Sequence, residues 1–219
     1  MERSSTEARL SNPAGRPIMK IHALMIPDPI TITENASITE ALELMKLNSI
    51  RHLPVIAADN LLRGFVTLAD LKQGLIPSMV GDVSLSDLMI SDPITIGPDD
   101  DIEIAAQLIY KYKISGIPVV TDDSLVGIIT ETDILRAFID MMGILSGSSR
   151  IDVVIKDERG AFKEASQIIT DSGGDIINVG MTAQQTSKRI YYFRLTACKT
   201  DGIKKALESK GFEVLEAMD

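Results

Sequence analysis

The chain has 219 residues, 45% of them hydrophobic and 24% charged, with a formal net charge of −9. This composition is typical of a globular protein and excludes wholesale disorder. The negative charge repels a phosphate backbone, and no Lys/Arg-rich run provides a local exception, so nucleic acid is excluded as a primary partner. No apolar run reaches the roughly 20 residues that span a bilayer, and the N-terminus has no hydrophobic signal core. We therefore expect a cytoplasmic protein that does not enter a membrane.

The first residues differ in composition from the rest of the chain. Residues 1–18 are rich in Ser, Arg, Glu and Pro and show no helical or strand periodicity. Such a segment has too little apolar surface to order itself by burial. We interpret it as a disordered or added arm, with Met19 as an alternative start.

Cys198 is the only cysteine. A disulfide within the chain and a cysteine-based zinc site are therefore excluded, and a reducing cytosol fits best. We expect a small buried strand residue rather than a catalytic thiol, because only His22 and His52 could act as its base.

An internal repeat begins at two nearly identical segments, MIPDPITI at 25–32 and MISDPITI at 89–96, which are offset by 64 residues. In both copies a helix is expected next, because apolar residues follow at i, i+3, i+4 and i+7, counted from Ile38 and from Ile102. The repeat should therefore be treated as the unit of the fold.

Each of these helices begins at a residue suited to capping. Ser37, with Glu40 three residues later, forms a capping-box pattern, and Asp101 stands at the same place in the second copy. Carboxylates before a helix are stabilised by its positive end. We therefore interpret the run from Asp99 to Asp101 as helix stabilisation, and expect no metal site.

A hairpin and a second helix complete each copy. The expected strands are HLPVI at 52–56 and GIPVV at 116–120, followed by GFVTLAD at 64–70 and GIITETD at 127–133, where a short strand runs into a helix. The resulting order is strand, helix, strand, hairpin, strand, helix, with one copy at 19–82 and the other at 83–141. Two such units are expected to stack and to form a cleft about a pseudo-twofold axis.

These duplicated segments resemble a tandem pair of cystathionine-β-synthase (CBS) domains, a Bateman module. The resemblance covers roughly residues 19–141 and rests on the DPITI, (H/G)(L/I)PV and G-h-h-T-x-x-D segments, where h is an apolar residue, each found twice in the same order. It implies an α/β fold and a ligand cleft between the copies.

The two Thr-x-x-Asp pairs, Thr67 with Asp70 and Thr130 with Asp133, have two interpretations. A capping box would use the hydroxyl and the carboxylate to satisfy backbone amides at a helix start. A ligand site would use the carboxylate to accept two ribose hydroxyls. The two roles are compatible, since a carboxylate has about four acceptor positions.

The resemblance to CBS pairs implies an adenosine-type ligand, AMP, ADP, ATP or S-adenosylmethionine, with these Thr and Asp residues on its ribose and phosphate side. It also implies that Thr31 and Thr95 lie near the base. Arg51 and His52 are candidate phosphate ligands in the first copy, and Arg136 is the candidate in the second.

The candidate cations are distributed unequally, since Ser115 and Gly116 stand at the positions of Arg51 and His52, and Gln73 at that of Arg136. Hydrogen bonds to charged groups contribute about 1.5–3 kcal/mol each, so the two sites should differ in affinity, with one dominant. A solvated surface side chain remains the alternative for each cation.

A different module is expected after a Gly- and Ser-rich linker at 142–149. In residues 150–219 the pattern predicts the order βαββαβ, which is the ferredoxin-like split motif. The expected elements are a strand at 151–155, a helix at 161–172, strands at 176–182 and 189–196, a helix from 200 to 211 and a strand at 212–215.

The C-terminal segment resembles an ACT domain, a module that binds amino acids or related effectors, usually at a dimer interface. Asp157, Gly160 and Asp175 correspond to the expected effector-binding positions, although Arg159 replaces the usual proline and Asp175 an asparagine. An ACT domain that only dimerises fits equally well, since fold does not fix function. A CBS pair followed by an ACT domain resembles the AcuB-like family of acetoin utilisation proteins.

Three functions remain open. The favoured hypothesis is a regulatory sensor, a homodimer without cofactor or catalytic residues, that acts on a target protein not specified by the sequence. A ligand-free assembly scaffold is the second. A nucleotide-processing enzyme is the third and is disfavoured, because the chain has no P-loop, no Gly-x-Ser-x-Gly elbow and no clustered base and nucleophile.

Overall fold

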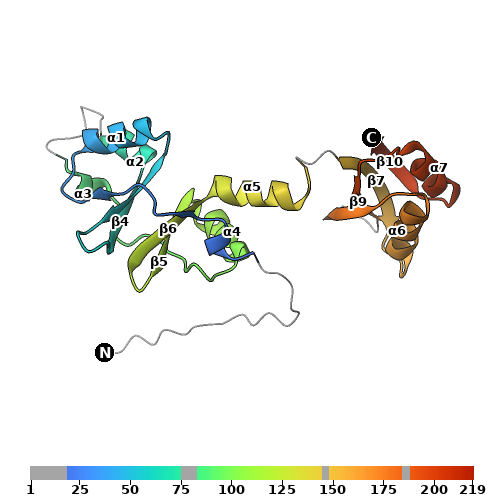
Figure 1. Ribbon diagram of the computed structural model, residues 1–219, viewed down its shortest axis with the longest axis horizontal. Helices are drawn as coiled ribbons and strands as arrows, with labels where there is room; N and C mark the ends of the chain where they lie inside the picture. The colour runs from blue at the N-terminus through green and yellow to red at the C-terminus, as the bar shows by residue number, and fades with distance from the viewer. Residues whose placement is uncertain (1–18, 75–82, 145–147, 184–187) are drawn as a thin grey trace. The chain divides into compact units, whose positions relative to one another are not determined.

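The computed structural model describes residues 19–74, 83–144, 148–183 and 188–219 (Figure 1). The predicted arm at 1–18 lies outside them. The chain divides into two compact units, Met1–Ile134 and Leu135–Asp219, so that the division falls within a helix. Among the described residues, no helix is both long and apolar enough to cross a bilayer.

The first unit consists of two similar halves, as the repeat predicted. Its described elements are η1 Ile21–Ala23, β1 Ile26–Pro27, β2 Ile32–Thr33, α1 Ile38–Leu47, β3 His52–Ile56, β4 Leu62–Thr67, α2 Leu68–Gly74, α3 Leu85–Leu88, α4 Ile102–Tyr112, β5 Gly116–Thr121, β6 Ser124–Thr130 and α5 Glu131–Met141. One three-stranded sheet has the order β2-β3-β4, and the other has the order β1-β6-β5.

The DPITI segments form much less strand than expected. In the first copy β2 contains only Ile32 and Thr33, paired in parallel with β3, and in the second Ile96 makes a single parallel bridge to Val119. Pro29 and Pro93 have no N–H to donate to a ladder, so the parallel pairing begins only after them. The segments therefore join their sheets at one or two residues only.

The two helix starts differ more than their sequences suggest. Ser37 caps α1 as predicted: its Oγ accepts from the Glu40 amide at 3.1 Å, and a Glu40 carboxylate oxygen accepts from the Ser37 amide at 2.7 Å. Asp101 stands at the N-cap of α4, but its side chain makes no capping bond. It accepts instead from the Lys20 ammonium at 2.8 Å. The predicted side-chain cap at Asp101 is thus wrong, and the carboxylate pairs with a cation from a distant segment instead.

The two halves exchange the segments that precede their first helices. β1 of the first copy pairs with β6 of the second, while Ile90 of the second copy pairs with Phe65 of the first. The two hydrogen bonds between Ile90 and Phe65 are 2.8 and 3.0 Å long. Each half therefore completes its sheet with chain from the other.

This exchange explains the glycine of each Gly-x-x-Thr-x-x-Asp segment. A Cβ on Gly64 would lie 2.6 Å from the sulfur of Met89, and a Cβ on Gly127 would lie 2.5 Å from the sulfur of Met25. Both methionines belong to the exchanged segments. A side chain at either glycine would force the exchanged segment to shift, because the Ile90 and Ile26 carbonyl oxygens also lie 3.0 and 3.1 Å from the added Cβ. Neither glycine has a positive φ.

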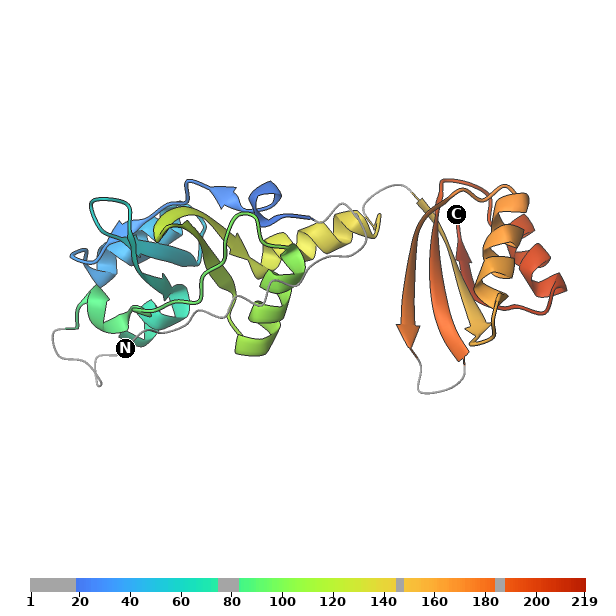
Figure 2. The same cartoon turned by 90° about the horizontal axis from the view of Figure 1, so that it is seen from below.

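The second unit has the predicted order βαββαβ after the end of α5. Its elements are β7 Ser148–Lys156, α6 Ala161–Asp171, β8 Ile176–Ala183, β9 Lys188–Thr196, α7 Asp201–Ser209 and β10 Glu213–Met218. The strands form one antiparallel sheet in the order β10-β7-β9-β8. Both helices cover the same face of this sheet (Figure 2), where Phe193 and Ile169 are fully buried.

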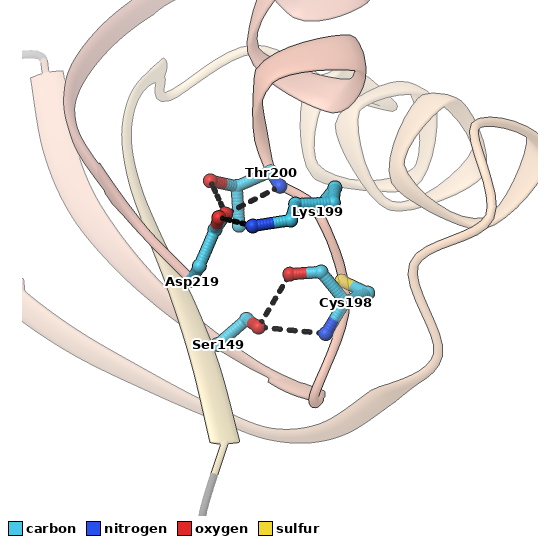
Figure 3. A network of polar contacts seen from close by, with 5 residues as sticks. All are labelled: Ser149, Cys198, Lys199, Thr200 and Asp219. Atoms are coloured by element: carbon cyan, nitrogen blue, oxygen red, sulfur yellow. Dashed lines mark hydrogen bonds and ion pairs between the residues drawn. The ribbon is translucent and has the colours of Figure 1, made fainter.

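A polar network connects the last residue to the start of α7 (Figure 3). One carboxylate oxygen of Asp219 accepts from the amide and the hydroxyl of Thr200, both at 2.9 Å, and the other accepts from Lys199 at 2.7 Å. The Lys199 ammonium and these bonds to Thr200 lower the pKa of Asp219 to about 2. The final residue thus takes the capping role at α7.

Cys198 lies next to this network, beyond the end of β9, and is only half-buried. The prediction of a buried strand residue is therefore wrong. Its backbone N–H and C=O both bond to the buried Ser149 hydroxyl, each at 2.9 Å. The backbone of Cys198 thus fixes the loop, and its side chain packs against the hydrophobic core of the second unit.

Candidate functional site

In the first repeat, Thr67 and Asp70 make the predicted capping interaction. Oδ2 of Asp70 accepts from the Thr67 amide at 2.9 Å and from the Thr67 hydroxyl at 2.6 Å. The hydroxyl accepts in turn from the Asp70 amide at 3.3 Å. The pair fixes the turn from β4 into α2.

Thr130 and Asp133 repeat this geometry between β6 and α5, with distances of 2.9, 2.6 and 3.4 Å. In both pairs the two bonds that the carboxylate accepts use Oδ2. Among the described residues, none donates a hydrogen bond to Oδ1 of either aspartate. Each carboxylate therefore caps its helix and keeps one oxygen available for another donor.

Arg51 precedes β3, and its backbone and its side chain contact different repeats. Its carbonyl accepts from the Leu68 amide of its own repeat at 2.9 Å. Its guanidinium lies 4.0 Å from the carboxylate of Glu131, the residue that follows Thr130 in the other repeat. Both side chains of this pair are more than half exposed. The cation predicted for the first copy thus lies beside the motif of the second.

His52, the other predicted phosphate ligand, is buried between the repeats. Its Nε2 is 2.7 Å from the Ser115 hydroxyl, and its ring stacks on Phe65 with centroids 5.8 Å apart. The ring also occupies the space beside Gly116, where a Cβ would lie 3.1 Å from it. His52 therefore joins the two hairpins.

The electrostatics of His52 do not match those expected of a phosphate ligand. Burial, and then the charge of Arg51, lower the pKa of the imidazole below its usual value, so it is neutral at pH 7. The carboxylates of Glu131, Asp133 and Asp70 act in the opposite direction. Both aspartates are thus close enough to influence the same ring, although they belong to different repeats.

The remaining candidates are Thr31, Thr95 and Arg136, and among the described residues no hydrogen bond or ion pair ties them to the motifs. Thr31 is half-buried directly before β2, and Thr95 is exposed directly before Ile96. Arg136 lies on α5 with a largely exposed side chain, 3.9 Å from Asp140. Their roles toward a ligand remain predictions.

The predicted effector residues of the second unit do not meet within one chain. Asp157 lies beyond the end of β7, where its carboxylate accepts from Arg189 at 2.9 Å, and Gly160, with φ +94°, precedes α6. Asp175 is bound through its carbonyl to Thr196, at the opposite end of the sheet. β7 and β8 run in the same direction, so the loop after β7 and the loop before β8 lie at opposite ends of the sheet. Asp157, Gly160 and Asp175 can therefore share one site only if two copies of the chain contribute to it.

The described residues of both units contain no group of three or more His, Cys, Asp or Glu side chains placed to hold a metal ion. One surface cavity of about 430 Å³ lies in the second unit, against α6 and the end of α7. It is lined by Gly160, Lys163, Glu164, Gln167, Ile168 and Lys210.

The duplicated motif and the exchanged segments define a protein class. Residues 21–76 and 85–140 each match the family model of the CBS domain. The chain therefore belongs to the CBS domain family and contains two copies of this domain.

The curated relatives are longer proteins. A homoserine O-acetyltransferase of Methanocorpusculum labreanum is 40% identical over 114 residues, which are 51% of this chain and 23% of the relative. An L-aspartate semialdehyde sulfurtransferase of Methanocaldococcus jannaschii is 34% identical over 139 residues, 63% of this chain and 27% of the relative. The chain thus spans about a quarter of their length.

Two solved structures match the chain over little more than half its length. A CBS domain pair in complex with 5′-methylthioadenosine and S-adenosyl-L-methionine has a TM-score of 0.53 and 33% identity, covering 56% of this chain and 97% of that one. A structure described as a putative acetoin utilization protein (AcuB) of Vibrio cholerae has a TM-score of 0.52 and 30% identity, covering 58% and 95%.

Proposed function

We propose that this protein is a non-catalytic regulatory sensor that binds an adenosine-type ligand, AMP, ADP, ATP or S-adenosylmethionine, at its two Thr-x-x-Asp motifs. The observation that carries the proposal is the duplicated geometry of Asp70 and Asp133. Each uses one carboxylate oxygen to hold its own turn and leaves the other without a donor among the described residues. A pair of vicinal ribose hydroxyls supplies the missing donors.

The capping bonds also prepare each motif carboxylate to bind a ligand. A carboxylate fixed by its own capping bonds is already oriented, so a ligand loses less entropy in binding to it. Thr31 and Thr95, which precede the paired residues of each DPITI segment, are assigned to the base. The similar CBS pair solved with two adenosine derivatives supports this class of ligand.

Regulation requires that the ligand bind two arrangements of the protein with different affinity, because only differential binding shifts a population. We assign the second unit as an ACT domain of ferredoxin-like fold that forms a homodimer. Asp157 and Gly160 of one copy and Asp175 of another could then hold a second effector between them. The similarity to an AcuB structure supports placement in the acetoin utilisation family.

The test is isothermal titration calorimetry with AMP, ATP and S-adenosylmethionine on the whole chain. We expect at least one of them to bind, and Asp70→Ala or Asp133→Ala to weaken the binding of each ligand that does. Asp99→Ala is the matched control, since this exposed carboxylate lies outside both motifs. If no adenosine ligand binds, the ligand-free scaffold is the correct function.

Product analysis by chromatography distinguishes a sensor from an enzyme. The bound nucleotide should be recovered unchanged after prolonged incubation with the protein. Turnover that Asp133→Ala abolishes without loss of binding would instead show a nucleotide-processing enzyme.

Sedimentation of the whole chain, with and without amino acids, tests the second unit. A dimer that an amino acid stabilises supports an effector site between copies. A dimer that no amino acid affects supports an ACT domain that only dimerises.

A further inference from the structure

The starts of β3 and β5 lie against each other across the two repeats. The His52 ring and the Ser115 hydroxyl are 2.7 Å apart, although 63 residues separate them in sequence. Ser115 also accepts the Glu131 amide through its carbonyl at 3.0 Å. The residues before β3 are therefore held close to the turn that leads into α5.

Arg51 uses this proximity to place its charge beside the motif of the other repeat. Its guanidinium approaches the Glu131 carboxylate to 4.0 Å, and Glu131 lies between Thr130 and Asp133 in sequence. The two side chains remain 63% and 52% exposed, so water screens their attraction. Such a pair is weak enough for another anion to replace the glutamate.

The motif of the first repeat has no equivalent cation. Leu68 stands at the position of Glu131, and Ser115 stands at the position of Arg51. Among the described residues neither Asp70 nor Asp133 forms an ion pair with Lys or Arg, so the difference between the motifs lies at these neighbouring positions. The two motifs thus share the same Thr–Asp geometry in different electrostatic surroundings.

We propose that the two motifs select adenosine ligands by charge, with Arg51 as the specificity-determining residue. The Thr130–Asp133 motif takes a ligand with an anionic substituent, such as the phosphate of AMP, which displaces Glu131 from the Arg51 guanidinium. The Thr67–Asp70 motif takes an adenosine ligand without negative charge. This inference rests on the proposed function, since it assumes that both aspartates bind ribose.

Glu131 is the internal competitor in this arrangement. Without a ligand, the Glu131 carboxylate occupies the place beside Arg51 that a phosphate would take. Its negative charge also repels an approaching phosphate. Removing the charge of Glu131 should therefore raise the affinity for a ligand with a phosphate. It should not change the affinity for an uncharged ligand at the Thr67–Asp70 motif.

The experiment compares AMP with 5′-methylthioadenosine, which lacks the phosphate, by calorimetry on the whole chain. We expect Arg51→Gln to weaken AMP binding about tenfold or more, as for the loss of a charged hydrogen bond. The affinity for 5′-methylthioadenosine should stay the same. Arg51→Lys should restore part of the AMP affinity. Glu131→Gln should strengthen AMP binding, and Arg63→Gln, an exposed arginine at the far end of β4, is the matched control.

The assignment to one motif is tested with the aspartate variants. AMP binding should be lost in Asp133→Ala and retained in Asp70→Ala. For 5′-methylthioadenosine, Asp70→Ala should remove the binding at the Thr67–Asp70 motif. The inference is overturned if both ligands bind and Arg51→Gln affects them equally or not at all. It is also overturned if AMP depends on Asp70 alone. If neither ligand binds the wild-type chain, the proposed function itself fails.

Discussion

The two repeats of the first unit agree in their turns and exchanged segments and differ at the residues where their hairpins meet. Both place Thr and Asp in the same turn, and both place a methionine from the other repeat against a glycine. They differ at His52 and Gly116, which lie opposite the motif threonines in the two hairpins. Duplication thus preserved the scaffold and left the space between the copies free to diverge.

The largest expected effect on stability comes from the buried core, which should contribute equally in the two copies. Leu53 and Ile117 occupy the same position of β3 and β5, and both are fully buried. We expect Leu53→Ala and Ile117→Ala each to lower the free energy of unfolding by about 2–5 kcal/mol, because each leaves a cavity. Urea denaturation measures both. A loss confined to one of them would mean that only one repeat contributes to the shared core.

The exchanged segments provide the second test. Gly64→Ala and Gly127→Ala should each lower the free energy of unfolding by about 1–3 kcal/mol, because the new methyl group meets a methionine sulfur. Met89→Ala combined with Gly64→Ala should cost less than the sum of the two single changes. Thermal denaturation of the single and double variants tests this, and strict additivity would contradict the contact.

The residues at the starts of α1 and α4 should contribute differently to the stability of the protein. Ser37→Ala removes a capping hydroxyl, and we expect a loss of about 1 kcal/mol. Asp101→Ala removes only a partly exposed ion pair with Lys20, so the loss should be smaller, in the range of about 0–1 kcal/mol. Urea denaturation of both variants gives the comparison. An equal or larger loss at Asp101 would show that it caps α4 after all.

The smallest effect concerns pH. The pKa of His52 is lower in the folded protein than in the unfolded chain, so its contribution to stability is complete above the unfolded pKa of about 6.5. This contribution is lost as the pH falls through the lower folded pKa, since the unfolded chain binds the proton first. Unfolding measured at neutral and mildly acidic pH should therefore depend less on pH in His52→Gln. His22→Gln, at an exposed histidine, should behave as the wild type.

Much of this fold follows from sequence periodicity. The helices, the hairpins and the βαββαβ order occur close to their predicted positions, because the apolar pattern and the capping residues are local signals. The strand predicted at DPITI is nearly absent, and the Asp101 carboxylate binds Lys20 and makes no capping bond. The Lys20 contact joins residues 81 positions apart, so no local pattern predicts it.

The candidate site was harder to predict because it depends on contacts between the copies. The sequence identified Thr67 and Asp70 but assigned Arg51 to their repeat, and only the reach of its side chain shows that Arg51 faces Glu131. The exchange had one signal in the sequence, a methionine repeated at an offset of 64 and a glycine repeated at an offset of 63. Neither residue type alone predicts that contact. The boundary at 142–149 stays a prediction.

The exchange of segments has a consequence for how such a protein could arise. A lone copy would present a last strand without its partner and a leading segment with no strand to join. Two identical chains could satisfy both by trading these segments about a twofold axis, as in a domain-swapped dimer. The tandem chain is the covalently linked equivalent of that dimer. Linkage removes the dependence on concentration, and it lets the two former subunits acquire different side chains.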